Sequence, residues 1–109
     1  MHELAITQSV VEAVAARVGD VPVAVVRLRI GRLSGVLPDA PRFCFEVAAA
    51  GTSLQGATLE IEEPDGRAHC RSCGQDFTLD DPILLCPCGS ADVRVVAGRE
   101  LTVASVQLV

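Results

Sequence analysis

The chain contains the segments His69-Cys70-Arg71-Ser72-Cys73-Gly74 and Leu85-Cys86-Pro87-Cys88-Gly89, which together hold four of its five cysteines. Two cysteine-containing turns separated by about a dozen residues can bring four thiolates around one point, and four thiolates are the ligand set of a closed, structural Zn²⁺ site. Gly74 and Gly89 follow the two pairs and can adopt the positive φ that such turns need. The pattern therefore predicts a structural zinc site formed by Cys70, Cys73, Cys86 and Cys88.

The second cysteine pair departs from the usual pattern. A single residue, Pro87, separates Cys86 from Cys88, where such turns usually have two. The shorter spacer strains the turn without removing a ligand, and His69 is available as a substitute ligand. Two disulfides are the competing interpretation. We favour zinc, because the first residues do not resemble a signal peptide and so give no support for an oxidising compartment.

Length and composition limit the function classes. At 109 residues the chain is expected to be one domain, or a small domain that carries a smaller insertion. Its net charge of -5 argues against nucleic acid as the main partner, because phosphate binding depends on clustered Lys and Arg. No apolar run approaches the roughly 20 residues that span a bilayer. We expect a soluble cytoplasmic protein.

The remaining chain alternates helical and extended patterns. Apolar residues recur at helical spacing from residue 4 to 18, alternate along 23 to 31, and return to helical spacing from Asp39 to about Ala50, where Phe43, Val47 and Ala50 share one side. Two further strands are expected at Thr58 to Glu63 and at Leu101 to Leu108. The predicted fold class is α+β, with two helices on one face of a small mixed three-stranded sheet and an inserted zinc-ribbon-like lobe.

These elements also predict a division of the chain. Residues 1-66, completed by 98-109, are expected to form the α+β domain, and residues 67-97 the zinc-binding lobe. In the sheet, Glu60 and Glu62 are expected to form ion pairs with Arg27 and Arg29 on the neighbouring strand. The lobe has too few apolar residues to fold without a metal or another cross-link.

Two further features bear on metal binding, namely the amino terminus and the fifth cysteine. The α-amine of Met1, the imidazole of His2, the amide between them and a donor from Glu3 can form a tetragonal set of N and O ligands suited to Ni(II) or Cu(II). Taken alone, these residues favour a simpler interpretation, with His2 solvated at a frayed terminus and Glu3 a first-turn carboxylate. Cys44, in the second predicted helix, is expected to be a small buried apolar residue and no ligand.

The chain as a whole resembles the HypA/HybF family. The resemblance rests on Met1-His2-Glu3 at the start, Arg29-Ile30-Gly31 ending the first strand, Phe43-Cys44-Phe45 in the second helix, Glu62-Glu63 ending the second strand, and two cysteine pairs before the last strand. The shortened pair at Cys86-Pro87-Cys88 departs from the family pattern.

This resemblance implies a nickel metallochaperone for [NiFe]-hydrogenase maturation. It implies Ni(II) as a transported ion bound by His2 with Met1 and Glu3, and structural Zn(II) held by the four cysteines. It implies as partners a HypB-type GTPase and the [NiFe]-hydrogenase large subunit, with urease maturation proteins as partners of some members.

Two other classes of function compete with this one. A zinc-ribbon interaction module would need the cysteines and would be indifferent to His2. A metal-dependent hydrolase would need an open coordination position for water, which four thiolates do not leave. The sequence also shows no nucleophile motif and no phosphate-binding glycine loop, so we do not expect an enzyme.

Overall fold

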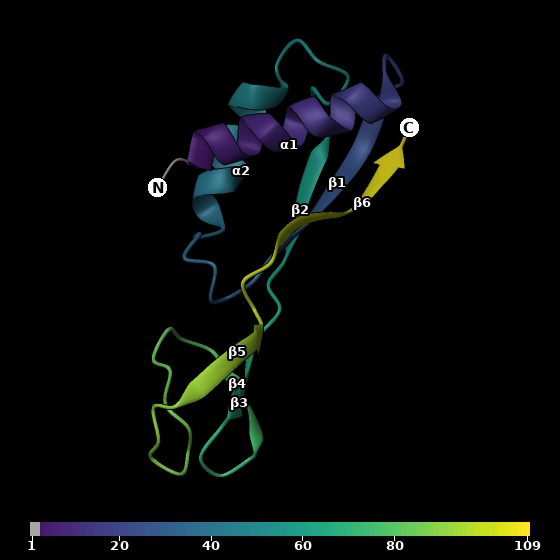
Figure 1. Ribbon diagram of the computed structural model, residues 1–109. Helices are drawn as coiled ribbons and strands as arrows, with labels where there is room; N and C mark the ends of the chain where they lie inside the picture. The colour runs from purple at the N-terminus through teal and green to yellow at the C-terminus, as the bar shows by residue number, and fades with distance from the viewer. Residues whose placement is uncertain (1–2) are drawn as a thin grey trace.

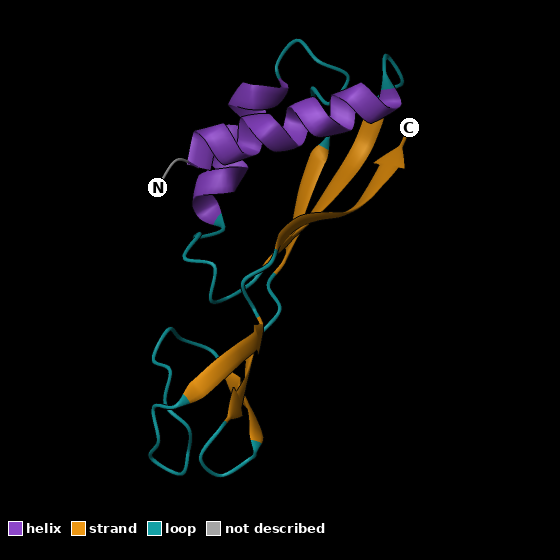
Figure 2. Ribbon diagram, viewed as in Figure 1, coloured by secondary structure: helices purple, strands orange, loops and turns teal. Residues whose placement is uncertain are grey.

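The computed structural model describes residues 3-109 as an elongated molecule of 52 × 23 × 17 Å with two separate three-stranded sheets (Figure 1). The helices and one sheet form one end, and the second sheet with its long loops forms the other (Figure 2). The elements in chain order are α1 (Glu3–Val18), β1 (Val23–Ile30), α2 (Asp39–Ala49), β2 (Thr58–Glu62), β3 (Gly66–Cys70), β4 (Asp76–Leu79), β5 (Val93–Ala97) and β6 (Leu101–Leu108).

The larger unit is built on the sheet β2-β1-β6. Strands β1 and β2 are parallel, because the connection between them runs through α2, whereas β6 returns antiparallel to β1. The predicted mixed three-stranded sheet is therefore confirmed. So are the predicted helices and strands, and no element end differs from its predicted position by more than one residue.

The core of this unit lies between the helices and one face of the sheet. Val26, Leu28 and Ile30 alternate along β1 and are almost completely buried beneath side chains from both helices. Burial of a side chain of this size contributes about 1.5 to 3 kcal/mol. The core residues are Val11, Val14, Val23, Val26, Leu28, Ile30, Val36, Phe45, Ala49, Leu54 and Leu59, and none of them comes from residues 67-97.

The opposite face of the sheet carries the predicted ion pairs. Arg27 contacts the Glu60 carboxylate at 2.7 Å, and Arg29 contacts that of Glu62 at 3.2 Å. Both pairs join residues directly opposite each other in the β1–β2 register. They are partly exposed, so pairs of this kind add at most about 1 kcal/mol each.

Helix α2 packs through a different side from the one that the sequence emphasises. Phe43 and Val47 do share a side, but they are 73% and 55% exposed. The buried side is Pro41, Phe45 and Ala49, which repeats at a spacing of four. The helix thus has two apolar stripes, and its rotation is fixed by tertiary contacts such as the 3.0 Å hydrogen bond that Arg42 Nη1 donates to the Leu59 carbonyl.

The second sheet, β4-β3-β5, is antiparallel throughout and was not predicted from the sequence. Its strands have only four or five residues each, and the central one reads Gly-Arg-Ala-His-Cys. Only the alternate positions Gly66, Ala68 and Cys70 of this strand are buried. A strand this short, without large apolar residues, gives no detectable alternation of apolar and polar positions in the sequence.

The two sheets meet at a junction that is closely packed around glycines. A Cβ at Gly31 would collide with the backbone carbonyl of Gly98, and a Cβ at Gly66 would collide with Leu33. The Leu33 amide donates to the Gly98 carbonyl at 2.7 Å, and Arg32 forms a 2.7 Å ion pair with Asp65. Backbone hydrogen bonds and steric contact therefore hold the connecting segments together.

Candidate metal centre

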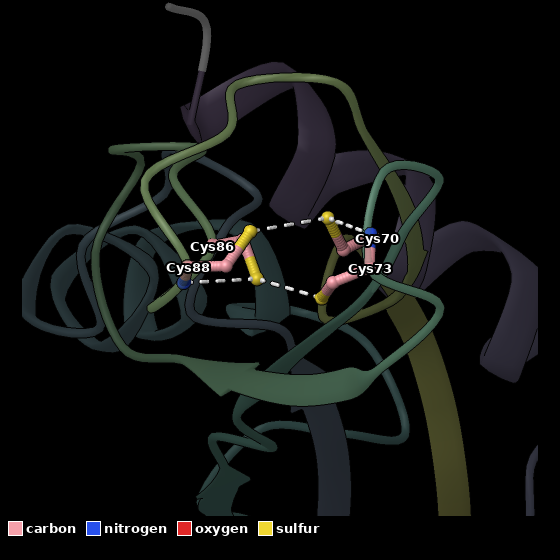
Figure 3. Close-up of side chains that lie close together, drawn as sticks. All are labelled: Cys70, Cys73, Cys86 and Cys88. Carbon is pink, nitrogen blue, oxygen red and sulfur yellow. Dashed lines mark hydrogen bonds between the residues drawn. The ribbon is translucent and has the colours of Figure 1, made fainter.

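Four cysteines from two turns meet in the smaller unit. Cys70 ends β3 and Cys73 lies in the turn toward β4, while Cys86 and Cys88 lie in the long loop between β4 and β5. Their side chains point toward one another from opposite sides of the site (Figure 3). The four sulfur atoms all lie within 4.8 Å of one another. We call these four residues the four-cysteine cluster.

The spacing of the sulfurs matches that of a tetrahedral ion. The Cys70 and Cys88 sulfurs are 3.8 Å apart, and those of Cys73 and Cys86 are 3.6 Å apart. A tetrahedral zinc ion with Zn–S bonds of about 2.3 Å places its sulfurs about 3.8 Å apart. All five cysteines of the chain are free. The four-cysteine cluster therefore suits a structural zinc ion.

Each turn directs backbone amides at its leading cysteine. In the first turn the Cys73 amide donates to the Cys70 sulfur at 3.4 Å, and the Gly74 amide donates to the Cys70 carbonyl at 2.9 Å. Gly74 has the predicted positive φ, 78°, which this tight return requires. Amide donors of this kind favour the thiolate form of cysteine, which is the form that binds metal.

The second turn reproduces the same bonds with one residue fewer. The Cys88 amide donates to the Cys86 sulfur at 3.4 Å, and the Gly89 amide donates to the Cys86 carbonyl at 2.8 Å. The shortened spacer around Pro87 therefore keeps both sulfurs in the cluster. Pro87 has no amide hydrogen to donate. The hydrogen bonds of this turn come from the amides of Cys88 and Gly89, so proline is compatible with it.

Side chains and backbone also tie the two turns to each other. The Ser72 and Ser90 hydroxyls are 2.8 Å apart, and Arg71 forms a 3.0 Å ion pair with Asp92. The Arg71 amide donates to the Asp92 carbonyl at 2.9 Å. These contacts fix the position of one turn relative to the other.

The environments of the two buried cysteines move their pKa values in opposite directions. Hydrogen bonding from the Cys73 amide lowers the pKa of Cys70 to about 6, against an opposing effect of burial. The Cys88 amide lowers the pKa of Cys86, but burial and the neighbouring thiols raise it by more, to about 12. Without a metal, Cys70 is therefore mainly a thiolate at neutral pH, and Cys86 must lose its proton when a metal binds.

This difference predicts how many protons zinc displaces. Near pH 7.5 Cys70 has already lost its proton, whereas near pH 5 it is protonated, so lowering the pH should add about one proton to the number released per zinc. Zinc affinity should fall over the same interval, because protons compete for the sulfur. Calorimetry in buffers of different ionisation enthalpy measures the number. The same proton count at both pH values would show that the Cys70 thiol is not acidic.

The other residues singled out from the sequence lie outside this cluster. The His69 ring contacts the Asp76 carboxylate at 2.7 Å across the β3–β4 pair, so it is not directed at the sulfurs. Cys44 is half-buried in α2 and is not part of the cluster. Met1 and His2 lie outside the described residues, and Glu3 is described only as the first residue of α1.

Comparison with known proteins identifies the family. The model described as "HypA: Hydrogenase/urease nickel incorporation, metallochaperone" matches residues 1-108. The chain belongs to the HypA family. Nickel is the metal that the family description names, and metal delivery, not catalysis, is the activity that it names.

Curated HypA relatives match over almost the whole chain. The hydrogenase maturation factor HypA of Geobacter metallireducens is 48% identical over 109 residues, covering 99% of each protein. That of Nostoc sp. is 44% identical over 108 residues, covering 99% of this chain and 96% of the relative.

A solved HypA structure has the same fold. The solution structure of the Ni metallochaperone HypA from Helicobacter pylori matches with a TM-score of 0.66 at 21% identity, covering 99% of this chain and 97% of that one. Among residues 3-109, no helix is long and apolar enough to cross a membrane.

Proposed function

We propose that this chain is a nickel carrier that binds Ni(II) at its amino terminus and delivers it during maturation of [NiFe]-hydrogenase. The observation that carries the proposal is the HypA family match over residues 1-108, which includes Met1-His2-Glu3 at the start of the chain. The amine of Met1, the imidazole of His2, the intervening amide and a donor from Glu3 supply the N and O ligands that suit Ni(II).

The position of these donors favours a metal that can be released. Helix α1 begins at Glu3, directly after Met1 and His2 in the sequence. The positive end of a helix dipole disfavours a nearby cation by roughly 0.3 to 1 kcal/mol. A site of this kind suits a carrier better than a permanent cofactor.

The zinc ion has the opposite role in this proposal. Cys70, Cys73, Cys86 and Cys88 hold it as a structural ion, and four thiolates leave no coordination position for a reacting water. Soft thiolates retain zinc, while the N and O donors at the terminus take nickel, so ligand type sorts the two metals. The chain accordingly acts without catalysis of its own.

The two metals correspond to the two parts of the chain. Residues 1-66, completed by 98-109, form the nickel-binding unit, and residues 67-97 form the zinc-binding lobe. Two separate sheets and a hydrophobic core without lobe residues support this division.

The partners follow from the same role. A HypB-type GTPase supplies the nucleotide-driven step, the [NiFe]-hydrogenase large subunit accepts the nickel, and urease maturation proteins are further candidates. Delivery takes place in the cytoplasm.

A nickel handover experiment tests this proposal. The untagged chain is loaded with nickel and mixed with the GTPase, GTP and nickel-free large subunit, and nickel in the large subunit is then measured. The parent should transfer about one nickel per chain, and His2→Ala should transfer almost none, because it lacks the anchoring imidazole. Equal transfer by both would show that His2 does not hold the delivered nickel, and transfer by neither would favour a zinc-ribbon interaction module that does not carry nickel.

A further inference from the structure

Strand β6 is an edge strand that lacks two of the usual protections, charged residues and proline. It pairs with β1 on one side, and within residues 3-109 no strand pairs with its other side. Seven of its eight residues are exposed, and it contains neither a charged residue nor a proline. Natural edge strands commonly carry charges or proline, because an open row of backbone groups otherwise recruits another strand.

A bulge in β6 determines which side chains face the helices. Ser105 lies opposite Arg27 and Val103 lies opposite Leu28, so Ala104 is an extra residue at the centre of the strand. The extra residue shifts the alternation by one position. As a result, Val103 and Val106 are on the same face, and both line one groove beside α1.

With the bulge at its centre, β6 has residues of similar character at equal distances from its two ends, and these face the same side of the sheet. The sequence Leu101-Thr102-Val103-Ala104-Ser105-Val106-Gln107-Leu108 has the same chemical order when read in either direction. An antiparallel pair of two copies would place leucine opposite leucine, valine opposite valine, and each remaining residue opposite one of similar size or polarity. The resulting pairs are Leu101 with Leu108, Thr102 with Gln107, Val103 with Val106, and Ala104 with Ser105.

A two-fold interface requires this kind of self-complementarity, since the same surface must fit itself. The apolar pairs would all lie on the helix-facing side and the Thr102–Gln107 pairs on the outer side, in agreement with the register to β1. The bulge would lie on the two-fold axis and leave a regular three-residue segment on either side. Because β6 carries no charge, no like charges would be opposed across the axis.

An apolar groove runs beside the same edge. It has a volume of about 400 Å³, and α1 lines it with the apolar Ala13, Val14 and Val18 and with Arg17, opposite Val103 and Val106 of β6. A second groove toward the start of α1 is lined by Ile6, Val10, Leu101 and Val103. The helix therefore leaves the apolar side of β6 partly uncovered, where the partner's Val103, Val106 and Leu108 would find apolar neighbours.

We infer that two copies of this chain associate through antiparallel β6–β6 pairing about a two-fold axis, which joins the sheets into one of six strands. The start of β6 lies toward the four-cysteine lobe and its end lies at the far end of the helical unit (Figure 1). The two lobes therefore lie at opposite ends of the joined sheet, where they do not collide.

Charge complementation across the axis tests this interface. In zinc-loaded full-length protein, Thr102→Lys with Gln107→Lys opposes two lysine pairs and should weaken the dimer about tenfold or more. Thr102→Glu with Gln107→Glu should also weaken it, but by less, because Arg29 lies opposite Thr102 and Arg27 donates to the Gln107 side chain. An equimolar mixture of the two variants should restore the dimer, because each lysine then faces a glutamate. Sedimentation equilibrium from about 1 to 200 µM covers the expected range of affinities.

The rescue separates pairing from misfolding, because unfolded variants would not recover on mixing. Thr58→Lys is the matched control, since it adds a lysine to an exposed position of β2, the other edge strand, and should leave the dimer unchanged. If the parent protein is monomeric at every concentration, the inference is wrong, and the exposed edge of β6 would be a candidate site for a strand of another protein. Unweakened double variants, or a mixture no tighter than its components, overturn it as well.

Discussion

A short amino-terminal extension is expected to abolish tight nickel binding, even though it changes no residue of the protein. The extension converts the Met1 amine into an amide, so the chelate ring of the proposed site could no longer form, while His2 and Glu3 remain in the sequence. We expect nickel affinity to fall by at least about a hundredfold, since even loss of an outer partner of a ligand costs about 10- to 100-fold. Isothermal titration with Ni(II) measures the change.

A carboxyl-terminal extension of the same sequence is the control. Both extensions must lack histidine, so that neither brings a nickel site of its own. The protein extended at its carboxyl terminus should bind one nickel as tightly as the parent, and both extended proteins should keep their zinc. Tight nickel binding by the protein extended at its amino terminus would exclude the amine as a ligand, and the site would have to be rebuilt around His2, Glu3 and other side chains.

Removal of Cys70 is expected to release zinc and unfold the lobe. Structural zinc contributes about 10 to 16 kcal/mol, so loss of one ligand in four should weaken binding by about 100- to 1,000-fold. The lobe has few buried apolar side chains that could keep it folded without zinc. Its buried side chains are Ala68, Leu79 and two of the cysteines, while Ile83 and Leu85 are exposed. Amide hydrogen exchange in Cys70→Ala should therefore rise across residues 67-97.

The larger unit should survive this change, because its core contains no residue from the lobe. Protection in β1 and α1 should stay close to that of the parent. Cys44→Ala is the matched control, since Cys44 is half-buried in α2 and outside the cluster. Full zinc content in Cys70→Ala, or equal zinc loss in Cys44→Ala, would show that the cluster does not hold the metal.

Two kinds of sequence signal were sufficient to predict structure. The alternation of Val26, Leu28 and Ile30 with two arginines placed one face of β1 in the core, as observed. The cysteine spacing predicted the cluster, because metal ligands must converge on one point whatever the rest of the loop does.

The features that the sequence did not predict depend on tertiary contacts. Helix α2 has two apolar stripes, and only its docking against the sheet shows that Phe45 is buried and Phe43 is exposed. The lobe sheet consists of short strands whose few buried positions are filled by Gly66, Ala68 and Cys70. The bulge at Ala104 becomes visible only in the register with β1.

Native mass spectrometry of the untagged parent and of His2→Ala, each supplied with Ni(II) and Zn(II), tests the central claim most directly. It counts both metals in the same molecule, so the zinc in the cluster serves as an internal reference for the nickel count. The parent should carry one nickel and one zinc per chain, and His2→Ala should carry one zinc and no nickel. If His2→Ala retains one nickel at the same concentration as the parent, the amino terminus is not the nickel site.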